Sequence, residues 1–334
     1  MDSDRLFELR RRTFDTPHFR GIEFIEVEAK SIINNVPGNY LPFNYTINPY
    51  RGCSHACTYC YARVTHTYMD MDAGRDFESK IVVKVNAPEL LRKELRARRW
   101  KGESIAMGTA TDPYQRAEGR YRLTRGIVET LAEFRNPFSI LTKGTLILRD
   151  LDLLVEAAEV TEVSTALSIG SVDEEVWRRS EPGTPHPRKR MEAVAKLNNA
   201  GIQCGVMIAP VLPGISDSEE QLRAVIEAAL DAGATHVSPI LLHLRPGVKE
   251  VYMQWLEENY PDLVPRYKAM YKAAYASPSD RKSFSARFGE IRDSFGPRPR
   301  RNPPPRRGTR FRRSRVEQIR RERAALETEQ LKLL

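Results

Sequence analysis

The strongest constraint on the fold is a regular alternation of short apolar segments with amphipathic helical segments between residues 45 and 245. The apolar runs predict six strands, at 45–47, 104–108, 138–142, 163–169, 204–209 and 235–242. Short apolar strands separated by amphipathic helices are typical of a parallel α/β sheet that is buried on both faces. An open doubly wound sheet and a barrel both fit the pattern, and six β/α units are fewer than the eight that close a full barrel.

The segment after the first predicted strand concentrates the metal-binding residues of the chain. Three of the four cysteines, Cys53, Cys57 and Cys60, fall within eight residues in the spacing C-x3-C-x2-C. Thiolates select soft metal centres such as iron–sulfur clusters, zinc or Cu(I). A cubane iron–sulfur cluster normally takes four cysteine ligands, so three cysteines leave one iron open to a substrate or cofactor.

A structural zinc site is the alternative for these cysteines, with His55 or Cys204 as the fourth ligand. Such sites usually pair two half-sites of the C-x2-C type, and this chain has one. Cys204 opens a predicted buried strand, where a free cysteine commonly behaves as a small core hydrophobe; the other interpretation is a catalytic hydrogen donor. His55 is expected to be a polar residue at the surface or beside the ligands.

The composition indicates a globular chain with a substantial core, since 41% of the 334 residues are hydrophobic. No run of about 18 apolar residues is present, so neither a transmembrane helix nor a membrane partner is predicted. Residues 1–20 are charged throughout and lack the apolar centre of a signal peptide. Four cysteines in a chain of this length do not form a disulfide framework, so a reducing, cytoplasmic location is expected.

The net charge of +9 is concentrated near the carboxyl end. Residues 281–334 contain 17 Lys and Arg against 6 Asp and Glu, whereas the rest of the chain contains 36 against 38. A localised basic segment is weaker evidence for nucleic-acid binding than a basic cleft. A solubilising role and a phosphate-binding role for this segment both stay open.

Four segments are predicted from these patterns. Residues 1–44 form an N-terminal extension with a strand-like alternation at 22–27, and 45–245 form the α/β core. Residues 246–294 form a helical C-terminal extension with helices at 248–258 and 263–275. Residues 295–334 form a Pro- and Arg-rich basic tail that is predicted to be disordered.

The cysteine loop resembles that of the radical S-adenosylmethionine (SAM) superfamily. The resemblance is carried by the C-x3-C-x2-C spacing, by Tyr59 immediately before the third cysteine, and by the position of the loop after the first strand; it covers about residues 45–245. It implies a partial (β/α)6 TIM-type barrel. It also implies that Cys53, Cys57 and Cys60 hold a [4Fe-4S] cluster whose fourth iron is chelated by SAM. The implied enzyme cleaves SAM reductively to a 5′-deoxyadenosyl radical, with an electron from a partner such as flavodoxin or ferredoxin.

Other cofactor contacts follow from the resemblance, because ligands collect at the carboxyl ends of strands in β/α folds. Gly108 and Thr109 end the second strand, where the superfamily often binds the amino group of the cofactor through backbone; the usual Gly-Gly-Glu is absent here. Lys143 is expected to pair with the carboxylate of the cofactor and Ser168 with its ribose. Backbone at 208–210 is expected to meet the adenine.

Within the superfamily the chain looks most like the branch related to spore photoproduct lyase, often called photolyase-like. The likeness is carried by the segments NPYRGC (48–53), GTATDPY (108–114), EPG (181–183) and APVLPG (209–214). The lyase relies on a cysteine near the second strand to return a hydrogen atom, and residues 103–112 contain none. This departure counts against the same DNA repair reaction in this chain. Nucleic-acid repair or modification by the same chemistry is one alternative function, and a non-enzymatic zinc or electron-transfer protein is another. The substrate stays unknown.

Further polar residues follow predicted strands and have two interpretations each. Asp112, Tyr114 and Gln115 either line a substrate pocket or belong to an ordinary turn. Glu181 either lines the same pocket or forms a salt bridge with Arg188 or Arg190.

Overall fold

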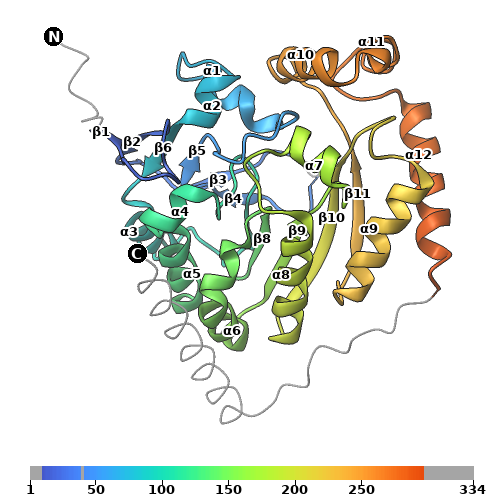
Figure 1. Ribbon diagram of the computed structural model, residues 1–334. Helices are drawn as coiled ribbons and strands as arrows, with labels where there is room; N and C mark the ends of the chain where they lie inside the picture. Colours follow the sequence, from blue (N-terminus) through green and yellow to red (C-terminus); the bar gives the residue numbers. More distant parts are fainter. Residues whose placement is uncertain (1–9, 39–40, 297–334) are drawn as a thin grey trace.

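The computed structural model of the chain describes residues 10–38 and 41–296 (Figure 1). Its main sheet has seven strands in the order β11-β10-β9-β8-β7-β4-β3. These are β3 (Ile33–Asn35), β4 (Tyr45–Ile47), β7 (Ile105–Met107), β8 (Phe138–Thr142), β9 (Val163–Ser168), β10 (Gln203–Val211) and β11 (Val237–Leu241). The six strands from β4 to β11 are parallel to their neighbours and follow chain order, while β3 adds an antiparallel edge. Strands β11 and β3 do not pair, so the sheet is the predicted partial barrel of six β/α units.

Helices cover one face of this sheet (Figure 1). They are α3 (Ala87–Leu95), α5 (Leu123–Glu133), α6 (Leu151–Val160), α8 (Pro187–Asn199) and α9 (Glu219–Asp231). Their apolar side chains and alternate residues of the strands, such as Ile140 and Val206, form the main core. Many of the residues between these positions, which face the other side of the sheet, are small, as at Ala106, Ser139 and Ala166. Leu141 and Met207 are larger exceptions on this inner face.

Shorter helices connect the strands near the carboxyl edge of the sheet. They are η2 (Tyr61–Arg63), α1 (Val64–Thr67), α2 (Arg75–Ser79), α4 (Arg116–Tyr121), η3 (Thr145–Asp150) and α7 (Glu174–Ser180). The segment from η2 to α2 directly follows the cysteines.

A second, accessory sheet is formed by β1 (Arg10–Thr13), β2 (Glu23–Val27), β6 (Lys80–Lys84) and β5 (Tyr50–Arg51), in the order β1-β2-β6-β5. The strand-like alternation at 22–27 is thus confirmed as β2. Strands β4 and β5 are separated by only two residues, Asn48 and Pro49, and they belong to different sheets. The chain therefore passes from the main sheet into the accessory sheet immediately before the cysteines.

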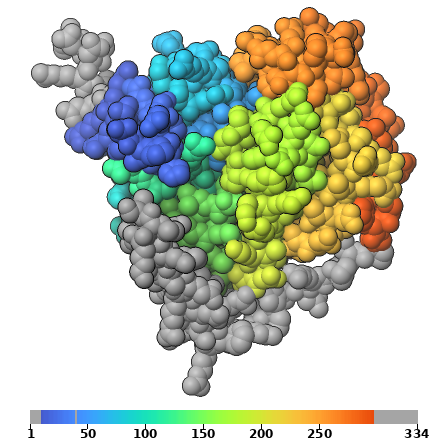
Figure 2. Space-filling model, in the orientation of Figure 1, coloured from blue at the N-terminus to red at the C-terminus, as the bar shows by residue number. Residues whose placement is uncertain are grey.

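The C-terminal helices are α10 (Val248–Asn259), η4 (Pro261–Leu263), α11 (Val264–Met270) and α12 (Pro278–Asp293). The first is close to its prediction, whereas the helix predicted at 263–275 is wrong in extent, because α11 ends at Met270. Helices α10 and α11 contribute to a second apolar cluster, which joins Tyr252 and Tyr267 to Cys57 and Tyr59. On the face shown in Figure 2, α10 and α11 (orange) lie directly against the segment around α7 (yellow-green).

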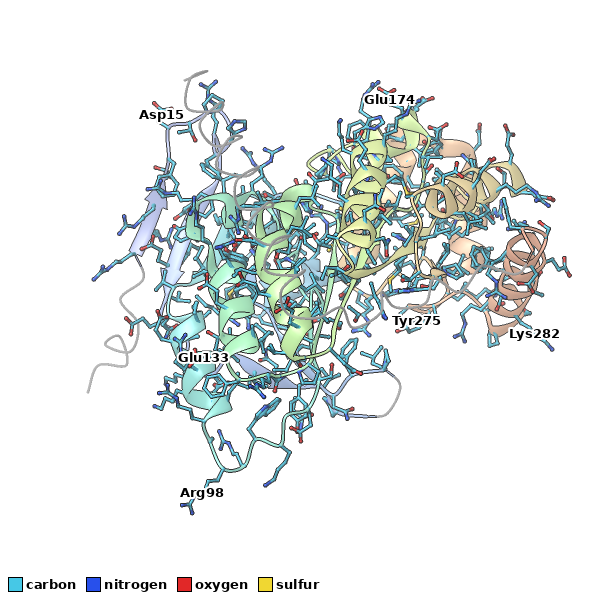
Figure 3. All side chains as sticks on the ribbon, turned by 90° about the horizontal axis from the view of Figure 1, so that it is seen from below. Asp15, Arg98, Glu133, Glu174, Tyr275 and Lys282 are labelled. Atoms are coloured by element: carbon cyan, nitrogen blue, oxygen red, sulfur yellow. The ribbon has the colours of Figure 1, made fainter. Side chains whose placement is uncertain are left out.

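Helix α12 packs against α9 at the β11 edge of the sheet. In the view from below, Glu133 of α5 lies on the left side and Lys282 of α12 at the right edge (Figure 3). No helix of the described part of the chain is both long and apolar enough to cross a membrane. The tail predicted to be disordered comprises residues 295–334. From residue 297 onward it lies outside the described residues, so that prediction is not tested.

Candidate cluster and cofactor site

The cysteine loop begins at Gly52, in a conformation that few other residues adopt. Gly52 has φ +81°, and a Cβ atom there would lie 2.9 Å from the carbonyl oxygen of Phe77. The amide of Cys53 donates to that same carbonyl oxygen at 2.9 Å. Glycine therefore allows the loop to pack closely on the end of α2.

The three thiols of the loop lie close together and are shielded from water. Cys53 and Cys57 are 6% and 5% exposed, and Cys60 is half-buried. Burial raises the pKa of the Cys53 thiol, and the charges of Asp112, Cys60 and Cys57 raise it further. Burial likewise raises the pKa of Cys57 and Cys60. Because a metal ligand must be the thiolate, binding here releases protons and needs a strongly attracting centre.

This arrangement fits an iron–sulfur cluster better than a zinc ion. A [4Fe-4S] cluster binds each cysteine at a different iron, so the thiolates need not converge on one point. A structural zinc ion needs four ligands around one centre, and within residues 10–38 and 41–296 no three His, Cys, Asp or Glu side chains are so placed. Cys204 packs in the main core with its thiol directed to the carbonyl of Gly205 at 3.6 Å. Neither it nor His55, whose ring turns to Asp112, completes a zinc site.

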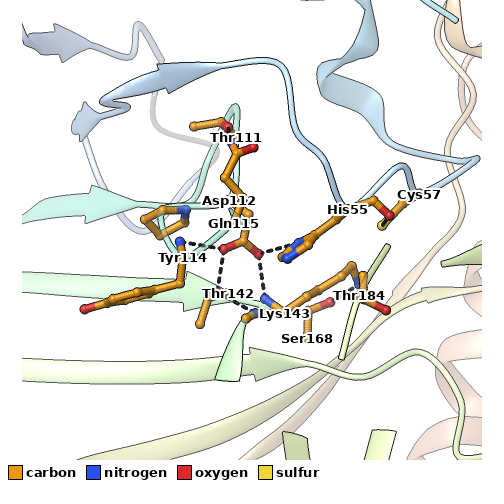
Figure 4. Close-up of polar contacts among 12 residues, drawn as sticks. His55, Cys57, Thr111, Asp112, Tyr114, Gln115, Thr142, Lys143, Ser168 and Thr184 are labelled. Carbon is orange, nitrogen blue, oxygen red and sulfur yellow. Dashed lines mark hydrogen bonds and ion pairs between the residues drawn. The ribbon is translucent and has the colours of Figure 1, made fainter. Parts of the chain in front are cut away.

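Two residues that follow β7 hold the cysteine loop in place (Figure 4). The Gln115 side chain accepts from the amide of Ser54 at 3.0 Å and donates to the carbonyl of Gly52 at 2.9 Å. Asp112 Oδ2 accepts from the amide of Lys143 at 2.7 Å and lies 3.3 Å from His55 Nδ1. Both side chains are therefore braces of the loop, a role that neither of their two predicted interpretations included.

The surroundings of Asp112 keep its carboxyl ionised. Burial raises its pKa, but the charge of His55 and the hydrogen bonds from Lys143 and Thr142 outweigh burial and lower it. His55 itself is 4% exposed, so it lies beside the cysteines and not at the surface. Of the two positions expected for His55, at the surface or beside the ligands, the structure shows the second.

The EPG segment after α7 is clamped onto the same loop. The amide of Thr58 donates to the carbonyl of Ser180 at 3.0 Å, and the amide of Gly183 donates to the carbonyl of His55 at 3.0 Å. A Cβ atom on Gly183 would lie 2.2 Å from the carbonyl oxygen of Ser54. The glycine is therefore required by the close contact between the two backbones.

Glu181 is the centre of a buried polar network at the carboxyl ends of β8, β9 and β10. Its carboxylate accepts from Lys143 Nζ at 3.1 Å, from Arg190 at 2.6 Å and from the Tyr59 hydroxyl. Lys143 Nζ also donates to Ser168 Oγ at 2.8 Å and to the carbonyl of Ala209 at 3.0 Å. The structure thus brings together the predicted Tyr59, Lys143 and Ser168. We call the network formed by four of these side chains the front network; its members are Tyr59, Lys143, Glu181 and Arg190.

The charges of the front network hold Glu181 in its ionised form. Burial raises its pKa, but Arg190 and Lys143 outweigh burial and lower it to about 2. Of the two arginines predicted as partners, Arg190 forms the ion pair. A small pocket adjoins the network; it is lined in part by Tyr59, Gly170, Ser171, Glu181 and Pro210.

The two other predicted cofactor residues lie at the end of β7. Gly108 has φ +92°, and a Cβ atom there would lie 1.9 Å from the carbonyl oxygen of Leu141, so only glycine fits. The carbonyl of Thr109 accepts from the Tyr61 hydroxyl, and Asn48 bonds both the Thr109 hydroxyl and the amide of Ala110. Asn48 was not predicted as a site residue. Its position next to the cysteine motif was the available signal.

A second buried network lies behind the loop and holds Tyr50, the first residue of β5. The Tyr50 hydroxyl donates to Glu118, which also accepts from Arg149 at 2.7 Å. Arg149 and Arg125 bond Asp150, and Arg125 also pairs with Asp152 at 3.1 Å. We call these residues the back network; its members are Tyr50, Glu118, Arg125, Arg149, Asp150 and Asp152.

An open α/β sheet with three clustered cysteines at its carboxyl edge defines the class of protein, and sequence comparison identifies the family. The sequence profile of the Radical SAM superfamily matches residues 47–226, more than half of the chain. The chain belongs to this superfamily. Membership implies an enzyme that uses a [4Fe-4S] cluster and SAM.

Similar proteins place the chain more closely. A protein of Mycobacterium tuberculosis that is named only as uncharacterised is 48% identical over 282 residues, which are 84% of this chain and 83% of that protein. A Radical SAM Nalpha-GlyT isomerase of Pseudomonas phage M6 is 25% identical over 57% of this chain and 37% of its own length. The structure of spore photoproduct lyase complexed with dinucleoside spore photoproduct covers 82% of this chain and 80% of that chain, with a TM-score of 0.59 at 18% identity. That likeness shows a shared fold.

Proposed function

We propose that the protein is a radical SAM enzyme in which Cys53, Cys57 and Cys60 hold the [4Fe-4S] cluster and SAM occupies the remaining iron. The observation that carries this proposal is the proximity of three thiols, two buried and one half-buried, at the carboxyl edge of a partial barrel, beside the front network. When bound, the cluster and SAM supply a 5′-deoxyadenosyl radical that abstracts hydrogen from the substrate. The protein orients these groups and excludes side reactions.

The residues of the site have distinct tasks in this proposal. Lys143 binds the carboxylate of SAM in exchange for one of the three hydrogen bonds that its ammonium makes in the free protein. The charge favours this, because the front network has two cations, Lys143 and Arg190, for the single carboxylate of Glu181. Ser168 lies within reach of the ribose, and the carbonyl of Thr109 is an acceptor for the amino group. The apolar cluster of α10 and α11 against Cys57 keeps water from the loop.

Anaerobic reconstitution with iron and sulfide tests the proposal. The wild-type protein is expected to become brown and to produce 5′-deoxyadenosine from SAM when a strong reductant is added. Cys57→Ala is expected to abolish both, whereas Cys204→Ala, in the core away from the loop, is expected to keep both. Reconstituted wild-type protein that does not cleave SAM would contradict the proposal, and purified protein with zinc but neither iron nor sulfide would favour the zinc alternative.

The electron is expected to come from an external one-electron protein such as flavodoxin or ferredoxin. The reason is that the proposed chemistry needs a low-potential electron and the chain has cysteines for one cluster only. Replacement of the chemical reductant by reduced flavodoxin in the same assay tests this partner. Formation of 5′-deoxyadenosine only with the chemical reductant would contradict it.

Modification of a nucleic acid is a second candidate function. It is favoured by the molecule bound to the structurally similar lyase, dinucleoside spore photoproduct, and by the basic composition of residues 281–334. Deletion of residues 297–334 is expected to weaken DNA or RNA binding and to flatten its salt dependence, since each lost phosphate contact reduces the slope. Unchanged binding would leave the tail without this role.

A further inference from the structure

The accessory sheet has one face that is apolar and one that carries cations. Tyr50 and Val83 are paired across β5 and β6, and both face the apolar cluster beneath α4. Arg51 is paired with Val82 and so lies on the opposite face. Lys84, two residues beyond Val82 on β6, lies on that same face. The pairing of the strands therefore makes Arg51 and Lys84 neighbours.

Two other cations of this face, Arg11 and Lys80, each have an acidic partner. Arg11 pairs with Glu23 at 3.1 Å, and Lys80 pairs with Asp76 at 2.9 Å. Arg51 and Lys84 have no carboxylate within ion-pair distance among the residues that the structure describes. They differ in this respect from Arg11 and Lys80.

The acidic residue whose charge reaches Lys84 is already engaged. Glu94 on α3 acts on Lys84, but its two carboxylate oxygens accept from the amides of Ile32 and Ile33 at 3.0 and 2.8 Å. Its charge is therefore used to fix the start of β3. It is not available as a close partner for the ammonium group.

The pair of cations is unfavourable in the free protein. Both side chains are half-buried. Burial lowers the pKa of Lys84 to about 8, and the neighbouring charge of Arg51 lowers it as well. A half-buried pair of like charges without an anion destabilises the fold, and groups with perturbed pKa values cluster at functional sites.

We propose that Arg51 and Lys84 form a binding site for a phosphoryl group. Two adjacent cations match the charge of a phosphate better than that of a single carboxylate, and the guanidinium of arginine binds phosphate oxygens through two parallel hydrogen bonds. Arg51 is two residues from Cys53, so a phosphate held here places the attached molecule beside the cysteine loop. The site needs neither cluster nor SAM, and its existence does not rest on the proposed radical chemistry.

Calorimetric titration of the full chain with inorganic phosphate at constant ionic strength tests the site. Lys84→Met and Arg51→Gln are each expected to weaken phosphate binding at least tenfold. Lys80→Met, which removes a paired cation from the same face, is the matched control and is expected to leave the affinity unchanged. Equal phosphate affinity in the wild type and the double variant, or no binding by the wild type, would overturn the proposal.

A measurement on the wild-type protein keeps the test independent of folding of the variants. The lowered pKa of Lys84, about 8, makes its amine reactive toward an amine-acylating reagent at that pH. Phosphate is expected to slow acylation of Lys84 and to leave the rate at Lys80 unchanged, as measured by mass spectrometry of peptides. Absence of this protection would also overturn the proposal.

The phosphoryl group can belong to a small phosphate ester or to the backbone of a nucleic acid. Titration with a mononucleotide and with a short single-stranded oligonucleotide distinguishes the two sources. Loss of mononucleotide affinity alone in the double variant assigns a small ester, and loss of oligonucleotide affinity with a reduced salt dependence assigns a backbone phosphate. If the double variant keeps its affinity for both the mononucleotide and the oligonucleotide, a role for this site in substrate binding is contradicted.

Discussion

The front and back networks each bury a glutamate against a tyrosine of the cysteine segment, but they differ in charge. The front network contains two cations, Lys143 and Arg190, for the one carboxylate of Glu181. The back network contains two arginines for three carboxylates, those of Glu118, Asp150 and Asp152. Burial therefore leaves an excess of positive charge on one side of the loop and of negative charge on the other.

The two glutamates respond to these surroundings in opposite ways. The cations of the front network lower the pKa of Glu181 to about 2 in spite of burial. Burial raises the pKa of Glu118 more than Arg149 and the hydrogen bonds lower it. We infer that the extra cation of the front network suits an anionic group of a ligand. In the back network the raised pKa of Glu118 offsets part of the negative excess, and its partners are residues of the fold.

The largest effect is expected from Glu118→Ala in the back network. The substitution leaves Arg149 with one carboxylate fewer and removes the acceptor of the Tyr50 hydroxyl and of the amide of Thr124. Removal of one partner from a buried ion pair costs about 3–5 kcal/mol of unfolding free energy. Unfolding of the wild type and of Glu118→Ala in urea measures this loss of free energy.

The matched control is Glu129→Ala at the exposed rim of the same network, where Glu129 pairs with Arg125 at 3.5 Å. This substitution is expected to cost less than about 1 kcal/mol. Equal losses in the two variants would show that burial does not decide how much a carboxylate paired with an arginine of the back network contributes to stability.

A smaller loss that depends on pH is expected from Glu181→Gln in the front network. The ordinary pKa of 4.5 falls to about 2 in the folded protein, so ionisation of Glu181 contributes on the order of 3 kcal/mol at neutral pH. Because the folded pKa is the lower one, this contribution is complete above pH 4.5 and is lost as the pH falls toward 2.

Unfolding measured from neutral to acidic pH should therefore show a difference between wild type and Glu181→Gln that shrinks on acidification. Glu174→Gln, which removes an exposed ion pair on α7, provides the control and should show no such trend. A constant difference at all pH values would mean that Glu181 is not held ionised by Lys143 and Arg190.

Gly183→Ala tests how much the close backbone contact of the EPG segment contributes to stability, because this substitution changes no charge. The added Cβ would lie 2.2 Å from the carbonyl oxygen of Ser54, so the EPG segment must move away from the cysteine loop, at a cost of about 1–3 kcal/mol. Iron incorporation on reconstitution is expected to fall as well. Gly119→Ala on α4, beside the back network, is the comparison, since no atom lies within 4 Å of its added Cβ; it should leave iron incorporation unchanged.

A specific effect on the cofactor is expected from Lys143→Met, which removes one partner of a buried ion pair. Glu181 keeps Arg190, but it loses one cation and Ser168 and Ala209 lose a donor, so the free energy of unfolding should fall by about 1–3 kcal/mol. Loss of a charge-assisted hydrogen bond of about 1.5–3 kcal/mol should weaken SAM binding about 10- to 100-fold, as measured by equilibrium dialysis. Lys189→Met, at an exposed pair, should leave SAM binding unchanged. Unaltered SAM affinity in Lys143→Met would argue against an anion site in the front network.

The six parallel strands of the main sheet could be predicted from the sequence because their apolar runs are separated by helices with a different period, whereas the antiparallel edge strand β3 was not predicted. The cysteine motif could be predicted because its ligands are local in sequence. Strand β5 could not be predicted, because a strand of only two residues contains no periodic pattern. The braces of the loop could not be assigned either, since Gln115 and Ser54 are 61 residues apart and only the folded sheet brings them together.

The ion pairs of the front network show the same limit. Arg188 and Arg190 lie on one helix, and the sequence left both as partners of Glu181. Their positions differ by more than half a turn, so only one of them faces inward. Arg190 is fully buried and makes the contact; the orientation of α8 on the sheet decides this, and that orientation depends on the whole core.

The junction between β4 and β5 has a consequence for the order of assembly. Because only Asn48 and Pro49 separate two strands of different sheets, the start of the cysteine loop is fixed as soon as both sheets form. Fixing a backbone costs roughly 1–2 kcal/mol of conformational entropy per residue, and here folding meets that cost before any iron is bound. A cluster is then inserted among ligands that the fold has already positioned. A zinc finger differs in this respect, because its chain remains unfolded until the metal binds.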